Sequence, residues 1–253
     1  MMNKIYTHCI DDGHGGTDPG AVGKRSTHEA DINLAIGKIV GRIMTEQGQK
    51  VIFTRTTDKF LTLATRADIA NKAGCRTFTS IHCNSAAAID AHGIETWSFT
   101  NSVEGLKLSK VVQGELVKTT GLTDRGSKQA NFGVLRMSNM VAILVESAFI
   151  SNTNEEVLLM QAEYQEKVAL GIVKGIFKYL GLTFNQSIIK TTPIIIKVAA
   201  TKIDQNILQI QQICIKLGVN DHFGNRVVAD GIDGPNTQSA KAKLKLFLTN
   251  ILK

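Results

Sequence analysis

Three short apolar runs in the chain are each followed closely by a residue whose side chain can bind a metal ion. The runs and these residues are 4–10 with His14, 77–81 with His82, and 141–145 with Glu146. Parallel strands of an open sheet end at one shared edge, where ligands bind. If the runs are parallel strands, two imidazoles and a carboxylate that lie far apart in the sequence converge in space.

The segments between these runs alternate between helical and strand patterns. Residues 29–44 carry Ile32, Ile36 and Val40 at helical spacing, and residues 51–54 follow as a short strand, which completes a β-α-β unit. Further helices are expected at 63–73, 104–118, 154–161 and 164–180, a strand at 93–99, and a polar loop at 123–131. The unbroken apolar run 141–145 is typical of a central strand buried on both faces. This alternation predicts an α/β domain over residues 1–182.

Beyond residue 182 the pattern changes, and we predict a linker over 183–201 and a small helical module over 202–253. Residues 1–182 hold 20 Lys and Arg against 18 Asp and Glu, which is +2, whereas 183–253 hold 9 against 4, which is +5. A basic surface favours a polyanion such as nucleic acid, anionic lipid or an anionic wall polymer. A solvated basic face that aids solubility is the simpler explanation of the same charge.

Composition excludes several classes of protein. No apolar run approaches the roughly 18 residues of a membrane span, and residues 1–8 lack the apolar stretch of a signal peptide. We therefore expect neither a membrane span nor Sec export by a signal of the chain's own. The cysteines form no CxxC pair, which argues against a disulfide scaffold or a thiolate zinc finger, and we expect them to be reduced and mostly buried: Cys9, Cys75, Cys83 and Cys214.

Three of the candidate residues have simpler explanations when taken singly. His14 stands among glycines that could form a tight turn or cradle a phosphate, although the loop lacks both the P-loop sequence and GxGxxG. His82 could be a structural histidine at a strand end. Glu29 begins a helix, where a carboxylate favours the helix dipole.

Glu146 is harder to explain by structure alone. A glutamate that ends an apolar strand is costly to desolvate unless it meets a cation or strong donors. Together, His14, Glu29 and His82 are the nitrogen and oxygen ligands of a catalytic zinc site with a fourth position open to water. Glu146 would then accept a proton from water and pass it to a leaving nitrogen.

An ordered set of motifs runs through residues 4–180. They are Asp11-x-Gly13-His14-Gly15-Gly16, Glu29, Thr54-Arg55, Arg66 with Ala70-Asn71, Ser80-Ile81-His82-x-Asn84, and Leu144-Val145-Glu146-x-x-Phe149-x-Ser151-Asn152. In order and spacing this set resembles the zinc-dependent N-acetylmuramoyl-L-alanine amidases of the type-3 amidase family. The chain departs from the usual Asp-Pro-Gly-His of that family at Asp12, whose carboxylate either alters the surroundings of the zinc ligands or points to solvent.

The resemblance implies a twisted, mostly parallel sheet flanked by helices. It also implies Zn²⁺ held by His14, Glu29 and His82, with Glu146 as the catalytic residue. The expected reaction is hydrolysis of the amide between N-acetylmuramic acid and L-alanine in peptidoglycan. Asp11 and Asn84 are candidates for supporting a ligand or contacting substrate. His28 competes with Glu29 as a ligand, although the helix register favours Glu29.

The C-terminal module resembles a second family. Leu217-Gly218 and Asp230-Gly231-Ile232-Asp233-Gly234-Pro235-Asn236-Thr237 are similar to the peptidoglycan-binding type-1 module. The resemblance implies cell-wall binding by residues 202–253, and their basic charge would suit anionic wall polymers. The alternative is that the glycines make turns in an unrelated helical domain. Nucleic acid is not an expected partner, because the only aromatic residues beyond residue 182 are Phe184, Phe223 and Phe247.

Two other functions stay open on the sequence alone. One is a zinc peptidase that cuts within the stem peptide, and the other is a non-catalytic wall-binding protein that keeps the amidase fold. An enzyme that cuts walls without its own export signal must leave the cell by another route. We therefore expect it in the cytoplasm of the producing cell until a holin-type pore or lysis releases it, as a phage endolysin or, alternatively, an autolysin.

Overall fold

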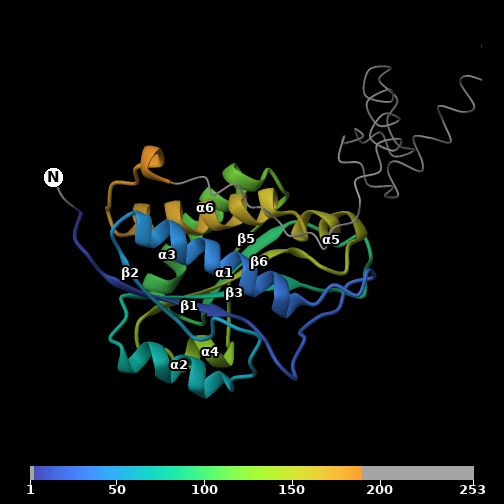
Figure 1. Ribbon diagram of the computed structural model, residues 1–253, viewed down its shortest axis with the longest axis horizontal. Coiled ribbons are helices and arrows are strands. Elements are labelled where there is room, and N and C mark those ends of the chain that lie inside the picture. The colour runs from blue at the N-terminus through green and yellow to red at the C-terminus, as the bar shows by residue number, and fades with distance from the viewer. Residues whose placement is uncertain (1–2, 190–253) are drawn as a thin grey trace, which may run out of the picture. The chain divides into compact units, whose positions relative to one another are not determined.

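The computed structural model describes residues 3–189, which form a central sheet between two layers of helices (Figure 1). In chain order the elements are β1 (Thr7–Asp12), α1 (Glu29–Glu46), β2 (Lys50–Phe53), α2 (Leu63–Lys72), β3 (Thr77–Asn84), β4 (Ile94–Phe99), α3 (Val103–Thr120), β5 (Asp124–Ala130), α4 (Gly133–Arg136), β6 (Val141–Phe149), α5 (Thr153–Leu159), α6 (Ala162–Tyr179) and the 3-10 turn η1 (Gln186–Ile188). The described part of the chain holds a six-stranded sheet in the order β2-β1-β3-β6-β4-β5. Neighbouring strands are parallel except β4 and β6, which are antiparallel. The predicted α/β class, with a mostly parallel sheet flanked by helices, is confirmed.

The larger hydrophobic core lies on the sheet face covered by α1, α3 and α6. Helix α1 packs its predicted apolar stripe there, including Ile36 and Val40. Helices α3 and α6 approach closely at Gly175, which has no side chain in the way. A Cβ atom at this position would lie 2.5 Å from Val112 Cα. Strand β6 lies between β3 and β4, and most of it is buried, as its unbroken apolar run predicts.

The opposite face of the sheet, under α2 and the short α4, carries a smaller core. Phe78 of β3 and Leu144 of β6 pack there. Because side chains alternate along a strand, His82 and Glu146 point to the same face as these two residues. Glu95 of β4 is the antiparallel register partner of Glu146, so its side chain points to this face as well. One end of this face therefore carries a row of ionisable side chains.

The structure corrects two predictions about strands. Residues 124–130 form β5, where a polar loop was expected. The segment lacks apolar alternation because polar contacts take the place of apolar packing: Ser127 bonds to Ser109 of α3 and Lys128 to Glu95. In addition, β3 and β6 run past their predicted ends, so His82 and Glu146 lie inside strands.

The start of the predicted linker packs against the α/β domain. The Phe184 ring meets Phe177 of α6 edge-on, with ring centroids 5.8 Å apart. The main-chain N–H of Asn185 donates to Gln47 Oε1 at 2.9 Å. Residues 190–201 of the predicted linker and the predicted wall-binding module, 202–253, lie outside the described residues, and so do all the Lys and Arg residues of the tail.

Among residues 3–189, no helix has both the length and the apolarity to cross a membrane. Cys9, Cys75 and Cys83 are free and buried. Cys214 lies outside the described residues.

Candidate active site

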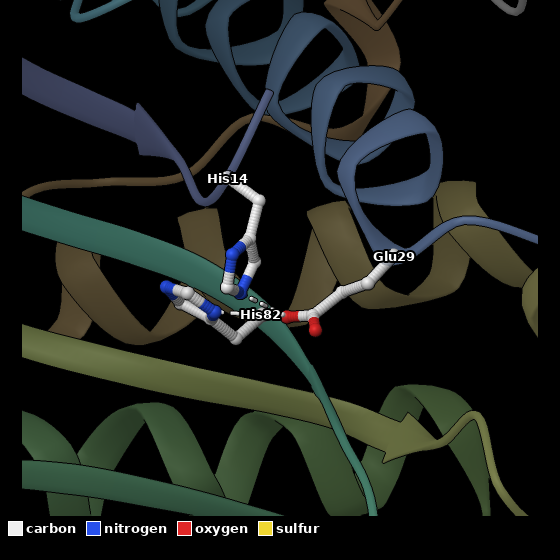
Figure 2. A group of neighbouring side chains, drawn as sticks. All are labelled: His14, Glu29 and His82. Atoms are coloured by element: carbon white, nitrogen blue, oxygen red, sulfur yellow. Dashed lines mark hydrogen bonds and ion pairs between the residues drawn. The ribbon is translucent and has the colours of Figure 1, made fainter. Parts of the chain in front are cut away.

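Three side chains from distant parts of the sequence converge at one end of the sheet (Figure 2). His14 lies in the loop after β1, Glu29 is the first residue of α1, and His82 lies in β3. Glu29 Oε1 is 2.8 Å from His82 Nδ1 and 3.3 Å from His14 Nε2. One potential ligand atom from each residue lies within 4.8 Å of the others. The predicted convergence of His14, Glu29 and His82 is therefore present in the structure.

The backbone at His14 is held in an uncommon conformation. Its φ of 62° is left-handed, a region that non-glycine residues rarely occupy without support. The Arg66 guanidinium donates to the His14 carbonyl oxygen at 2.7 Å. His14 Nδ1 lies 2.8 Å from Asp18 Oδ2, and this carboxylate fixes the ring so that Nε2 faces Glu29. Asp18 is not among the residues predicted from the sequence, because its contact with His14 depends on the geometry of this loop.

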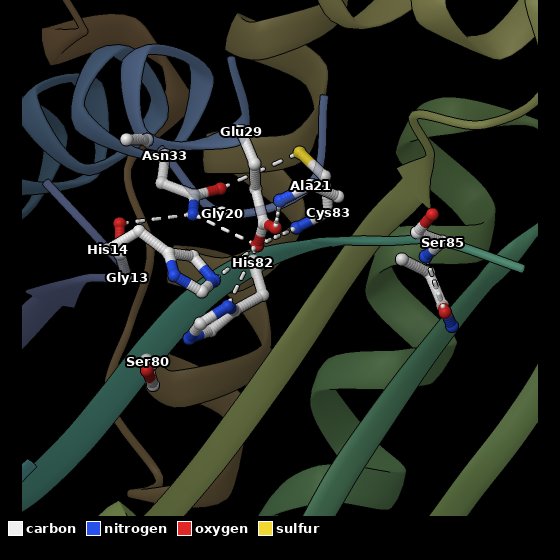
Figure 3. Close-up of polar contacts among 12 residues, drawn as sticks. Gly13, His14, Gly20, Ala21, Glu29, Asn33, Ser80, His82, Cys83 and Ser85 are labelled. Carbon is white, nitrogen blue, oxygen red and sulfur yellow. Dashed lines mark hydrogen bonds and ion pairs between the residues drawn. The ribbon is translucent and has the colours of Figure 1, made fainter. Parts of the chain in front are cut away.

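Glu29 is anchored on both carboxylate oxygens (Figure 3). The main-chain N–H of Ala21 donates to Oε2 at 2.9 Å, and that of Cys83 donates to Oε1 at 3.0 Å. Gly20, with φ of 68°, leaves room beside it, because a Cβ there would lie 2.7 Å from Glu29 Oε2. His28, the alternative ligand, is half exposed and lies instead 4.0 Å from Asp31. The structure thus brings Glu29, and not His28, to the two imidazoles.

The three groups shift one another's protonation. Burial acts to lower the pKa of His14, but contacts with Glu29 and Asp18 outweigh it and raise the pKa to about 9. The pKa of His82 is raised as well, because Glu29 outweighs burial there. Although burial opposes it, bonds from both imidazoles hold the pKa of Glu29 well below its usual range. A cation that binds here must displace protons from the imidazoles, so its affinity falls as the pH falls.

Glu146 lies beside this cluster, as its place in the sequence predicts. It is the register partner of His82 across β3 and β6. Its Oε2 atom is buried and has no hydrogen-bond partner among the residues that the structure describes. Burial, with Glu29 and Glu95 adding to it and His82 opposing, raises the pKa of Glu146 to about 7. A carboxyl group in this state can both accept and release a proton near neutral pH.

The two candidate supporting residues lie in different places. Asp11 is only 1% exposed, so it does not face substrate. It binds Arg66, the residue that also holds the His14 carbonyl, and so it supports the ligand loop indirectly. Asn84 donates to Glu95 Oε1 at 2.8 Å, on the side of the site toward β4.

Asp12, where the chain departs from the motif, does not point to solvent. It is fully buried, and neither carboxylate oxygen has a hydrogen-bond partner within residues 3–189. Burial raises its pKa well above the usual range. The side chain lies against α1 at Gly37, where a Cβ would meet Oδ1. It is therefore packed between β1 and α1.

Two imidazoles and a carboxylate on an α/β sheet, with a second, partly buried glutamate alongside, are the side chains that hydrolases use at a catalytic zinc ion. Comparison with known proteins identifies the family. The profile of the Amidase_3 family, N-acetylmuramoyl-L-alanine amidase, matches residues 9–178. The chain belongs to this family, and it is an amidase.

Named relatives and a solved structure agree with this assignment. The N-acetylmuramoyl-L-alanine amidase LytC of Bacillus subtilis is 36% identical over 175 residues, which are 68% of this chain and 35% of LytC. The endolysin of Bacillus phage SPP1 is 35% identical over 188 residues, which are 72% of this chain and 68% of the endolysin. The crystal structure of an N-acetylmuramoyl-L-alanine amidase from Clostridium difficile 630 has a TM-score of 0.68 and 39% identity, and the match covers 70% of this chain and 97% of that one.

Proposed function

We propose that the protein hydrolyses the amide between the lactyl group of N-acetylmuramic acid and L-alanine in peptidoglycan, with Zn²⁺ held by His14, Glu29 and His82. The observation that carries the proposal is the convergence of three side chains, from the loop after β1, from α1 and from β3, with one potential ligand atom of each within 4.8 Å of the others. Family membership supports the choice of substrate.

The donor atoms fit a zinc ion in kind and in spacing. Zinc binds imidazole nitrogen and carboxylate oxygen at about 2.0–2.2 Å, which places tetrahedral ligand atoms roughly 3.4 Å apart. The separations of 2.8 Å and 3.3 Å from Glu29 Oε1 to the imidazoles are close to this value. Asp18 at His14 Nδ1 supplies the carboxylate partner that a metal-bound imidazole commonly has.

Once bound, the ion would supply a Lewis acid that polarises the substrate carbonyl and activates a water molecule. Glu146 would take the proton from that water and transfer it to the nitrogen of the leaving L-alanine. Its place supports this role, since it neighbours His82 in the sheet and keeps Oε2 free of hydrogen bonds to the described residues.

Products from purified cell walls test the function. Mass spectrometry of the digest should show new L-alanine amino termini and glycan strands that have lost their peptides. Removal of metal with a chelator should abolish both products, and added Zn²⁺ should restore them. Cuts within the stem peptide would instead identify a peptidase, and intact walls with protein bound would identify a non-catalytic binding protein.

We also propose how the enzyme leaves the producing cell and which part of the chain binds the cell wall. The likeness to the SPP1 endolysin supports a phage endolysin, made in the cytoplasm of its host and released through a holin-type pore, with an autolysin freed by lysis as the alternative. The excess basic charge of residues 183–253 supports contact with anionic wall polymers. Such binding should weaken as salt rises, and a salt series of wall-binding assays that shows no change would contradict it.

A further inference from the structure

Two cations from the edge strand β5 converge on one buried carboxylate next to the active site. Glu95 Oε2 accepts from Lys128 Nζ at 2.6 Å and from Arg125 Nε at 2.8 Å. Glu95 Oε1 accepts from Asn84 at 2.8 Å and from Trp97 Nε1 at 3.1 Å. Glu95 is thus fixed by four donors, and it holds both cations in place.

This group lies in the same row as the proposed zinc site. His82 pairs with Glu146, and Glu146 pairs with Glu95, so the three side chains share one face of the sheet. Neighbouring strands are about 4.8 Å apart. The carboxylate that gathers Arg125 and Lys128 therefore lies about one strand beyond Glu146, on the side away from His82.

The charges do not cancel within the group. Lys128 and Arg125 bring two positive charges to the single negative charge of Glu95. Burial acts to raise the pKa of Glu95, but the bonds from Lys128 and Arg125 outweigh it and lower the pKa, so the carboxylate stays ionised. One positive charge is left over. Each cationic side chain is 35% exposed, so an anion in the site can reach it.

Aromatic rings hold the two cations in position. Lys128 Nζ lies 5.2 Å from the centre of the Trp97 ring, and the Arg125 guanidinium lies 4.7 Å from that of Phe149. Arg125 also donates to the His92 carbonyl oxygen at 3.3 Å. Cations that are already fixed lose little freedom when an anion binds.

The proposed substrate carries an anion at the matching distance. The residue after L-alanine in a stem peptide is a γ-linked D-glutamate, whose α-carboxyl group is either free or amidated. This group is the carboxylate nearest to the scissile amide, about one to two residue lengths, or roughly 4–7 Å, beyond the nitrogen that leaves. The distance agrees with one strand spacing beyond Glu146.

We propose that Arg125 and Lys128, held by Glu95, form a subsite that binds the free α-carboxylate of the stem-peptide D-glutamate. This inference rests on the proposed function. It makes the enzyme selective for stem peptides with the free acid over those with the amide. A charged hydrogen bond of this kind corresponds to roughly a ten- to hundredfold preference in kcat/KM.

Two soluble substrates test the subsite: N-acetylmuramoyl-L-alanyl-γ-D-glutamyl-L-lysine and its D-isoglutaminyl counterpart. The zinc-loaded, full-length protein should cleave the acid at least about tenfold better than the amide. Lys128→Met, which keeps an apolar chain over Trp97, should bring the ratio of the two close to one, chiefly through a higher KM for the acid. Lys128→Arg should keep the preference, and Lys110→Met, at an exposed lysine of α3, should match the wild type.

The outcomes separate the subsite from the proposed function. Zinc content and circular dichroism of each variant show that it is loaded and folded. A wild-type ratio near one, or equal losses on both substrates in Lys128→Met, overturns the subsite while the amidase function stands. Failure of the zinc-loaded wild type to cleave either substrate at the L-alanine amide overturns the proposed function, and the subsite with it.

Discussion

Two clusters of charged side chains lie close together at the same end of the sheet, and they differ in how completely their polar atoms are paired. In the first, Asp11 Oδ1 accepts from Thr54 at 2.7 Å and from Arg66 at 2.9 Å, and Oδ2 accepts from Ser80 at 2.6 Å. Asp11 is 1% exposed and Arg66 3%. This Asp11 cluster is closed to solvent and saturated with hydrogen bonds.

The second cluster, His14, Glu29, His82 and Glu146, is neither closed nor saturated. The imidazole side chains are 25% and 19% exposed, and Glu146 Oε2 is unpaired within the described part of the chain. Both clusters belong to motifs that are equally prominent in the sequence. Hydrogen-bond pairing and access to solvent, and not the presence of charge, therefore distinguish a group that holds the fold from one that can do chemistry.

The largest effect should come from the unpaired carboxylate. Glu146→Gln removes the proton acceptor but keeps the size of the side chain, so the rate should fall by roughly 10²- to 10⁴-fold. The measurement is the release of L-alanine amino termini, with zinc content determined on the same sample. Zinc should be retained. Glu104→Gln, at an exposed glutamate of α3, should leave the rate unchanged, and a Glu146→Gln enzyme of near-normal rate would contradict the assignment.

Substitutions in the Asp11 cluster should instead lower the stability of the fold. Arg66→Met leaves the Asp11 carboxylate buried without its cation, which should lower the free energy of unfolding by about 3–5 kcal/mol. Denaturant unfolding followed by the fluorescence of Trp97, the only tryptophan of the chain, measures it. Arg136→Met, at an exposed arginine of α4, should change stability by less than about 0.5 kcal/mol. Equal effects of the two variants would remove the distinction between the clusters.

Two histidines show the same contrast, because the pKa values of His8 and His14 shift in opposite directions. Burial, with Arg76 adding to it and Gln49 opposing, lowers the pKa of His8 to about 4, whereas that of His14 rises to about 9. In the unfolded chain His8 has its ordinary pKa of about 6.5. The lowered pKa in the fold therefore contributes to stability in full above pH 6.5, and this contribution is lost as the pH falls toward 4. The loss should be roughly 3 kcal/mol.

Denaturant unfolding at pH 7 and pH 4 checks the His8 prediction. His8→Gln removes this titrating group, so the wild type should lose roughly 3 kcal/mol more than the variant between the two values. Other acidic and basic groups titrate in both proteins and cancel in the difference. An identical loss in the two proteins would show that His8 is not buried in its neutral form.

The smallest effect concerns the support of a ligand. Asp18→Asn should weaken zinc binding by roughly 10- to 100-fold, because His14 Nδ1 loses its carboxylate partner. Competition with a chelator of known affinity measures the change. Asp68→Asn, on the exposed side of α2, is the matched control. Unchanged affinity in Asp18→Asn would mean that the contact at His14 does not support the ligand.

Much of the architecture could be predicted because apolar periodicity carries it. The stripe of α1 and the unbroken run of β6 mark elements whose packing is apolar. Strand β5 could not be predicted in this way, because Ser127 and Lys128 make polar contacts with Ser109 and Glu95 instead. An edge strand of this kind has no apolar signature.

The candidate site shows the same limit. His14, His82 and Glu146 could be found because each follows an apolar run, and Glu29 because it begins an apolar helix. Asp18 and Glu95 could not, since their roles depend on a loop geometry and on an antiparallel register that the sequence does not reveal. The role of a charged residue at this site therefore depends on partners that can be identified only in the folded structure.

Diffraction from crystals grown with zinc, recorded on both sides of the zinc absorption edge, locates the bound metal. We expect a single anomalous peak between the imidazoles of His14 and His82 and the carboxylate of Glu29, with ligand distances of about 2.0–2.2 Å and with Glu146 near it but unbound. A fully occupied zinc ion bound elsewhere, with these three side chains free of metal, would contradict the proposed zinc site.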